Sequence, residues 1–201
     1  ILEHLYLNGI DAEGFQDAKT VVESSVSLLT EPDDMMSLLT MLNSHTDFLY
    51  AHSLGVSMYG VMIARKVQWN SPANVHKVAM GGLLHDIGKK EIDRELLTKK
   101  RIDMTPEDVK LYESHPHRGA DLLKEISSVP TDVVQIAFQH HENCMGLGFP
   151  QGLTKNHIHP MARLVAVANE FCSLAVMNPN GPAMPPKDAI QRMISLYTGK
   201  L

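Results

Sequence analysis

Hydrophobic residues recur every three or four positions along most of the chain, the spacing that places them on one face of an α-helix. Between residues 15 and 29 this face holds Ala18, Val21, Val22, Val26 and Leu29. The same spacing predicts further helices over residues 34–41, 45–67, 72–84, 131–141, 161–176 and 187–197, and one from Thr105 that bends at His115-Pro116. Alternating polar and apolar positions, which indicate strands, are almost absent. The pattern predicts an all-α fold.

Capping and turn residues divide the chain between these helices. Ser71 and Thr105 each precede a proline, an arrangement typical of a helix N-terminus. Residues 143–154 are rich in glycine and proline and are expected to form a loop. Residues 1–44 carry none of the histidine chemistry described below. We therefore expect a short helical N-terminal segment over 1–44, the end of an upstream module, followed by the main domain over 45–201.

Composition narrows the class of protein. The chain has 201 residues, of which 44% are hydrophobic and 20% charged, enough for one globular domain with its own core. Its net charge of −5 argues against binding to a nucleic acid polymer, which usually needs a basic surface. Two cysteines are too few for a disulfide scaffold, and no apolar run reaches the ~18 residues of a membrane span. Because the sequence begins with Ile1, we expect it to be a fragment.

Histidine is unusually frequent, with eleven in the chain. His85 and Asp86 are adjacent at the end of a predicted helix, where the imidazole could hold one metal ion and the carboxylate could bridge two. Gly88 would let that helix end and the chain turn close to the site. Lys89 would offer a cation to an anionic substrate. An isolated pair of this kind is more often a buried histidine satisfied by its neighbouring acid.

Four more histidines favour a metal site over that alternative. His52 lies on the apolar face of the 45–67 helix, where an unpaired polar side chain is costly. His115 precedes a proline, and His140 and His141 close the 131–141 helix. Helical bundles build di-metal centres from such side chains on separate helices, and imidazole with carboxylate suits iron, manganese, zinc or cobalt. Two such ions about 3.5–4 Å apart would hold a bridging hydroxide and polarise a phosphoryl oxygen.

The ordered motifs HDIGK (85–89), HPxxG (115–119), HHE (140–142) and GxGxP (146–150) resemble the HD-GYP subfamily of HD-domain phosphohydrolases. The resemblance covers residues 47–179 and implies a helical bundle with two or three metal ions, often iron or manganese. It also implies a bacterial, cytoplasmic protein that hydrolyses the second messenger cyclic di-GMP to pGpG or GMP through a metal-bridging hydroxide. Lys89 would lie near the scissile phosphate. The implied metal ligands are His52, His85, Asp86 as the bridge, His115, His140 and His141.

Several positions depart from the pattern of that subfamily. Phe149 stands in place of the signature tyrosine, Asn143 in place of arginine, and Met145 in place of aspartate. Asn169 occupies the position of a metal-binding aspartate. It could still coordinate a metal through its carbonyl oxygen, or the neighbouring Glu170 could take that role.

The parts that would recognise substrate also differ. Cys172 replaces an aspartate that resembles a substrate-contacting position, and the segment Asn178-Pro-Asn-Gly lacks both cations of a phosphate clamp. Phe48 stands where three-metal members carry glutamate, so we expect two metals, with iron first and manganese as the alternative. Lys89 and Arg163 are the remaining cations for a phosphate, although Arg163 could equally pair with a structural acid.

Two classes of function follow from these observations. The first is a metal-dependent phosphodiesterase acting on cyclic di-GMP, with Asp86 and Lys89 as catalytic residues; a phosphohydrolase acting on another nucleotide is a variant of it. The second is a catalytically impaired nucleotide sensor or interaction module that keeps its metals and binds a signalling protein. The retained lysine and histidines favour the enzyme, and the departures favour the sensor. We expect His117 to lie at the surface and His159 at the surface or at a helix start.

Overall fold

A computed structural model describes residues 10–28, 34–44, 47–176 and 181–200. Within these ranges the chain is built from helices and connecting loops, with an isolated β-bridge between Met145 and Thr154 and no sheet. The all-α prediction is confirmed. Of the segment Asn178-Pro-Asn-Gly, only Gly181 belongs to the described residues, so the predicted loss of the phosphate clamp lies outside them.

The predicted helices are present, with ends shifted by a few residues. The α-helices are α2 (Ala12–Leu28), α3 (Asp34–Asn43), α4 (Phe48–Lys66), α5 (Pro72–Leu84), α6 (Arg94–Thr98), α7 (Pro106–Tyr112), α8 (His115–Lys124), α9 (Thr131–Gln139), α10 (Pro160–Ala175) and α11 (Pro186–Tyr197). Two short 3₁₀ helices, η1 (Ile87–Glu91) and η2 (Arg101–Asp103), lie between α5 and α7.

Side-chain caps start these helices where the sequence predicts them. The Ser71 side chain accepts a hydrogen bond from the Asn74 amide, and Thr105 forms a capping box with Asp108. The predicted bend at His115-Pro116 is wrong: α7 ends at Tyr112, and a separate helix, α8, begins at His115. Pro116 is therefore in the first turn of α8, where its missing amide hydrogen leaves no helical bond unmade.

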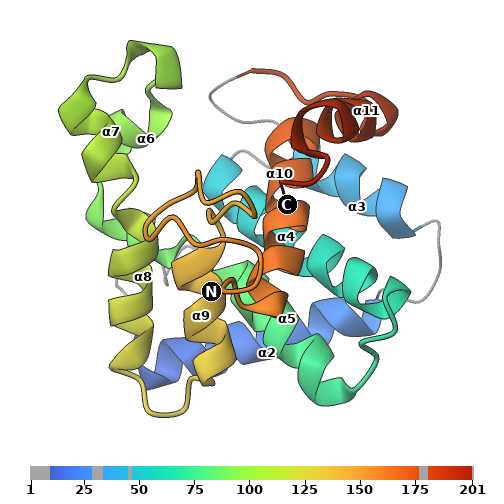
Figure 1. Cartoon of the computed structure of the whole chain (residues 1–201). Helices are drawn as coiled ribbons and strands as arrows, with labels where there is room; N and C mark the ends of the chain where they lie inside the picture. Colours follow the sequence, from blue (N-terminus) through green and yellow to red (C-terminus); the bar gives the residue numbers. More distant parts are fainter. Residues whose placement is uncertain (1–9, 29–33, 45–46, 177–180, 201) are drawn as a thin grey trace.

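The core lies between α4, α5 and α10, which pack against one another at the centre of the molecule (Figure 1). α9 also packs against α5, and α8 packs against α9. α2 also joins this core, because Phe15, Ala18 and Val22 are buried in the same cluster and α2 packs on α5. The domain boundary after residue 44 stays a prediction, with α2 and α3 packed on the main domain.

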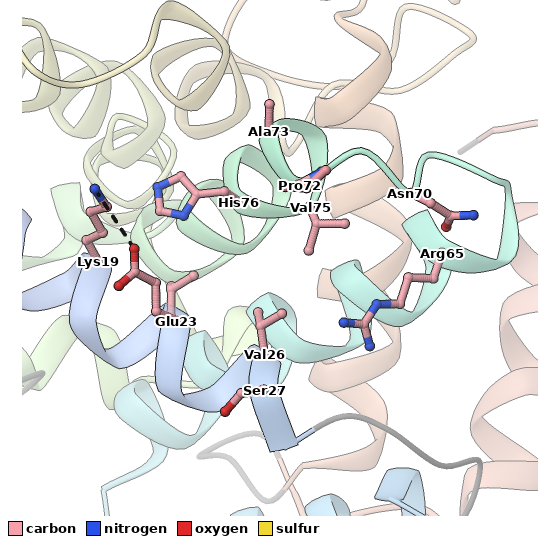
Figure 2. Close-up of a pocket in the computed structure, with 11 residues that line it drawn as sticks. Lys19, Glu23, Val26, Ser27, Arg65, Asn70, Pro72, Ala73, Val75 and His76 are labelled. Atoms are coloured by element: carbon pink, nitrogen blue, oxygen red, sulfur yellow. Dashed lines mark ion pairs between the residues drawn. The ribbon is translucent and has the colours of Figure 1, made fainter.

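A cavity of about 980 Å³ lies between α2, the end of α4 and the start of α5 (Figure 2). Lys19 and Glu23 of α2 lie beside His76 of α5 at this cavity, and the two α2 side chains approach within 3.9 Å. His76 precedes His85 by nine positions, which corresponds to about 14 Å along a helix. The cavity is therefore separate from the histidine cluster at the other end of α5.

Candidate metal centre

The site forms where the ends of several helices meet around one carboxylate. His85 is the C-cap residue of α5, Asp86 follows it before η1, and His115 begins α8. His140 is the C-cap residue of α9, and His141 follows it. The structure brings these residues together although up to 56 positions separate them in the sequence, as predicted from the motif order.

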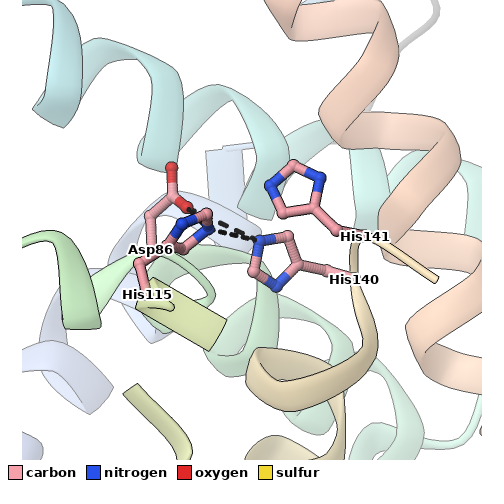
Figure 3. Close-up of side chains that lie close together, drawn as sticks. All are labelled: Asp86, His115, His140 and His141. Atoms are coloured by element: carbon pink, nitrogen blue, oxygen red, sulfur yellow. Dashed lines mark hydrogen bonds and ion pairs between the residues drawn. The ribbon is translucent and has the colours of Figure 1, made fainter. Parts of the chain in front are cut away.

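Asp86 belongs to two groups of side chains whose ligand atoms lie within 4.8 Å of one another. The first group combines Asp86 with His115, His140 and His141 (Figure 3), and the second combines it with His52 and His85. A carboxylate shared by two sets of histidine side chains is the arrangement expected of a residue that bridges two metal ions.

The two oxygens of Asp86 face different groups. Oδ1 lies 3.1 Å from Nε2 of His115 and 3.5 Å from Nε2 of His140. Oδ2 lies 3.3 Å from Nε2 of His85 and 3.9 Å from Nε2 of His52. Each oxygen is thus directed to one histidine set, and the carboxylate divides the site into two halves.

Backbone carbonyls fix the orientation of three histidine rings. Nδ1 of His85 donates to the carbonyl of Gly82 at 2.7 Å, Nδ1 of His115 to that of Tyr112 at 2.7 Å, and Nδ1 of His140 to that of Ala137 at 2.8 Å. Each acceptor lies three residues before its histidine. This contact holds the proton on Nδ1 and leaves Nε2 as the lone-pair nitrogen, which is how metal-binding imidazoles are usually prepared.

Burial sets the protonation states that metal binding requires. His85, His115 and His140 are buried, and His52 retains 13% of its side-chain exposure. Burial lowers the pKa of His52 and of His140 to about 3, and it also lowers the pKa of His115. At neutral pH these rings are uncharged and can act as ligands.

Asp86 stays ionised in the same surroundings. Burial acts to raise its pKa, but the neighbouring His85 and Lys89, with His115 and His140 beside the carboxylate, lower the pKa well below its usual value. An ionised carboxylate surrounded by neutral imidazoles is the donor set that suits iron, manganese, zinc or cobalt. Nε2 of His85 and Nε2 of His141 are buried and have no hydrogen-bond partner among the described residues. Buried ring nitrogens without a hydrogen-bond partner are expected where a metal ion would be their partner. The residues present therefore fit the metal centre.

Lys89 lies against the carboxylate that it follows in the HDIGK motif. Its Nζ donates to Oδ2 of Asp86 at 2.5 Å, and the residue is 9% exposed. The ammonium group also lies 5.4 Å from the ring centre of Tyr112, the residue whose carbonyl orients His115. Lys89 and a metal ion would therefore compete for the same oxygen of Asp86.

Asn169 and Glu170 of α10 point to different neighbours. Oδ1 of Asn169 lies 2.9 Å from Nε2 of His52, within hydrogen-bonding distance, so Asn169 lies at the His52 half of the site. Glu170 is hydrogen-bonded to Tyr197 of α11, and burial raises its pKa. Of the two alternatives left open by the sequence, Asn169 is the one placed beside a predicted ligand.

The other predicted side chains are distributed as follows. Arg163 of α10 forms no ion pair within the described part of the chain, and its buried Nε has no hydrogen-bond partner there. The predicted surface position of His117 is confirmed by its 64% side-chain exposure. The alternative of a helix start holds for His159, whose side chain caps α10. Cys172 is fully buried among apolar residues.

Sequence reasoning missed two residues that shape the site, and it misread a third. Tyr112 supplies the carbonyl that orients His115, and Glu142 holds the following loop through two backbone amides. Gly88 does not have a left-handed backbone; it is needed because a β-carbon there would lie 2.1 Å from the carbonyl oxygen of His115. Tyr112 could have been found because it lies three residues before His115, the position of the carbonyl that orients each of these histidines. The contact between Gly88 and the His115 carbonyl has no signal in the local sequence.

Comparison with known proteins supports this description. Residues 36–198 match the HD domain family. The chain is 32% identical over 173 residues to "Cyclic di-GMP phosphodiesterase PA4108" of Pseudomonas aeruginosa, covering 86% of this chain and 41% of that protein. It is 30% identical over 202 residues to "Cyclic di-GMP phosphodiesterase" of Thermotoga maritima, covering 98% and 53%. The chain thus spans about half the length of these curated relatives.

A solved structure shares the fold. "Bd1817, a HDG"Y"P protein from Bdellovibrio bacteriovorus" superimposes with a TM-score of 0.82 at 24% identity, covering 99% of this chain and 63% of that one. The chain belongs to the HD domain family. Its ordered motifs, together with these relatives, place it in the HD-GYP subfamily. None of the described helices has the length and hydropathy required to cross a membrane.

Proposed function

We propose that the protein hydrolyses a phosphodiester bond of a cyclic dinucleotide at a two-metal centre held by His52, His85, Asp86, His115, His140, His141 and Asn169. One observation carries the proposal: a single buried carboxylate, Asp86, is shared by two sets of histidine nitrogens, and backbone carbonyls already orient three of these rings. The names of the two relatives support cyclic di-GMP as the substrate, with pGpG or GMP as product.

The proposed centre divides the work between metals and side chains. Metal ions bound here, iron or manganese, would supply Lewis acidity toward a phosphoryl oxygen and toward water. Asp86 would be the ligand shared by the two ions, and the carbonyl-anchored histidines would hold them. Phe48, at the position of the third-metal glutamate, offers no carboxylate, which supports two ions rather than three.

Lys89 would act on the substrate phosphate. Its ammonium group lies 2.5 Å from Oδ2 of Asp86, so the cation is held beside the carboxylate that would bind the metal ions and would be within reach of a phosphate bound there. A cation beside the scissile phosphate stabilises the charge that builds up on the phosphoryl and leaving oxygens. Arg163, with a buried Nε that lacks a hydrogen-bond partner among the described residues, would be the second cation for phosphate.

A nucleotide sensor that keeps its metals is the second candidate, and the observation that favours it is Asn169. An amide beside His52 gives that half of the site one negative charge less than a carboxylate would. A weakly held ion there would leave a protein that binds nucleotide and hydrolyses it slowly or not at all.

The test is to measure metal content and hydrolysis in one sample. Protein prepared without oxygen is assayed for iron and manganese per chain and for turnover of cyclic di-GMP and of the mixed guanine–adenine cyclic dinucleotide. We expect about two ions per chain and turnover that is lost in Asp86→Asn but kept in His117→Ala, a matched change at an exposed histidine. Two ions per chain without turnover of either nucleotide would refute the enzyme and favour the sensor.

A further inference from the structure

His141 differs from the other histidines of its group in how its ring is held. His85, His115 and His140 each donate from Nδ1 to a backbone carbonyl. His141 forms no such bond within the described residues, and its buried Nε2 also has no hydrogen-bond partner there. A side chain without hydrogen bonds can turn about its single bonds, so another contact must set the direction of this ring.

Phe149 provides that contact. Its ring stacks on the ring of His141 with 4.5 Å between centres and 23° between planes. The same phenyl ring lies 6.2 Å from the ring of His115 in an edge-on arrangement. The other rings that touch His141 belong to His115 and His140, which are themselves proposed ligands. Phe149 is thus the one stacking partner, among the described residues, that lies outside the ligand set.

The loop that carries Phe149 is tied to the chain next to His141. The amide of Phe149 donates to the carbonyl of His141 at 3.2 Å. The buried carboxylate of Glu142 accepts from the amides of Gln151 and Leu153, both at 2.7 Å. At Gly148, a β-carbon would lie 2.4 Å from the carbonyl oxygen of His141, so only glycine allows the loop to fold this closely. These contacts hold the phenyl ring at a fixed place relative to the imidazole.

We propose that Phe149 is a positioning residue that sets the ring of His141 for metal binding in the Asp86–His115–His140–His141 group. The proposal rests on the metal-dependent function proposed above. The flat face of the aromatic ring, which Phe149 shares with the tyrosine of the subfamily pattern, orients His141. The hydroxyl group of that tyrosine has no part in this role. Loss of the ring should therefore weaken one of the two metal sites and leave the His52–His85 group unaffected.

The experiment is a titration of metal-free protein with Mn²⁺ against a competing chelator, which reports two dissociation constants. Phe149→Ala and Phe149→Leu remove the flat ring, and Phe149→Tyr keeps it. Phe138→Ala is the matched control, since Phe138 is a half-buried aromatic residue that contacts His117 and Lys124 instead. Thermal unfolding monitored by circular dichroism identifies any variant that fails to fold, and Phe149→Leu still gives an answer if Phe149→Ala is lost.

We expect Phe149→Ala and Phe149→Leu to weaken one Mn²⁺ site about 10–100-fold, the usual cost of removing a group that orients a metal ligand. The other site should keep its affinity, and Phe149→Tyr and Phe138→Ala should match the unmodified protein. Two unchanged dissociation constants in Phe149→Leu, in a wild-type protein that binds two ions and hydrolyses substrate, would overturn the positioning role alone. A wild-type protein that binds no Mn²⁺ would instead refute the metal-dependent function.

Discussion

Replacing Gly88 with alanine tests how closely the metal centre depends on backbone packing. A β-carbon at position 88 would lie 2.1 Å from the carbonyl oxygen of His115 and 2.5 Å from the amide nitrogen of Gly119. Both atoms belong to the backbone of α8, so no side-chain rotation can relieve the overlap. The first turn of α8 must therefore move away from η1, and His115 must move with it.

The size of the effect follows from these distances. Nonbonded contacts to a β-carbon are essentially never shorter than 3.0 Å, so α8 must shift by about 0.9 Å in a tightly packed interior. A shift of that size along the contact would lengthen the 3.1 Å separation between His115 Nε2 and Asp86 Oδ1 to about 4 Å, beyond the ~0.2 Å tolerance of metal coordination. Overpacking of this kind also costs about 1–3 kcal/mol of folding free energy.

Thermal unfolding, metal content and turnover measure the three consequences. We expect Gly88→Ala to melt about 2–12 °C lower, to bind metal more weakly and to lose on the order of 10²-fold in turnover. Gly181→Ala is the matched control, because a β-carbon there would meet no atom within 4 Å. A Gly88→Ala protein with unchanged melting temperature and metal content would show that α8 yields freely, and that His115 is not held in place by this contact.

Three further predictions concern charges. Lys89→Met should keep or tighten metal binding, because the ammonium no longer competes for Asp86. The same change should slow turnover ~10²–10³-fold, whereas Lys90→Met should leave turnover near normal. Unchanged turnover in Lys89→Met would contradict the role of Lys89. Asn169→Asp should strengthen chelator-resistant metal binding on the order of tenfold by adding a carboxylate beside His52, and weaker binding would contradict this. Lys77 lowers the pKa of Asp132 by a hydrogen bond at 2.7 Å, so this carboxylate stabilises the fold above its unfolded-state pKa and ceases to do so as pH falls through the lowered value. Asp132→Asn should lower the free energy of urea unfolding by less than about 1 kcal/mol at pH 7 and leave it unchanged near pH 2, and an equal loss at both pH values would contradict the ion pair.

The residues of the site could be predicted from the sequence because each has a local signal. His85-Asp86 stands at a helix end, His115 precedes a proline, and His140 and His141 close an apolar helix. These signals depend on capping, backbone donors and burial, which act within a few residues. The break of the predicted helix at residues 113–114 follows from the same local chemistry of proline, but helix periodicity continues through it and concealed the separate start of α8.

Contacts between distant segments could not be predicted in this way. The packing of Gly88 against the first turn of α8 brings backbone atoms of residues 88 and 115 together. The local sequence of neither segment indicates this contact. Glu142 is a similar case, because its two amide partners lie nine and eleven residues away in an irregular loop. The side of Asp86 that each histidine faces also depends on the packing angles of α4, α5, α8 and α9, which the hydrophobic pattern does not determine.

The helices that carry His85 and His140 both end at the metal centre. The peptide dipoles of an α-helix add up to roughly half a negative charge at its C-terminus, concentrated in the last turn. α5 and α9 therefore direct about one negative charge in total toward the place where cations would bind, in addition to the carboxylate of Asp86. This contribution belongs to the main chain and survives any side-chain substitution. The electrostatic attraction for a pair of divalent ions is thus partly independent of residue identity, and the amide of Asn169 removes less of it than a count of formal charges suggests.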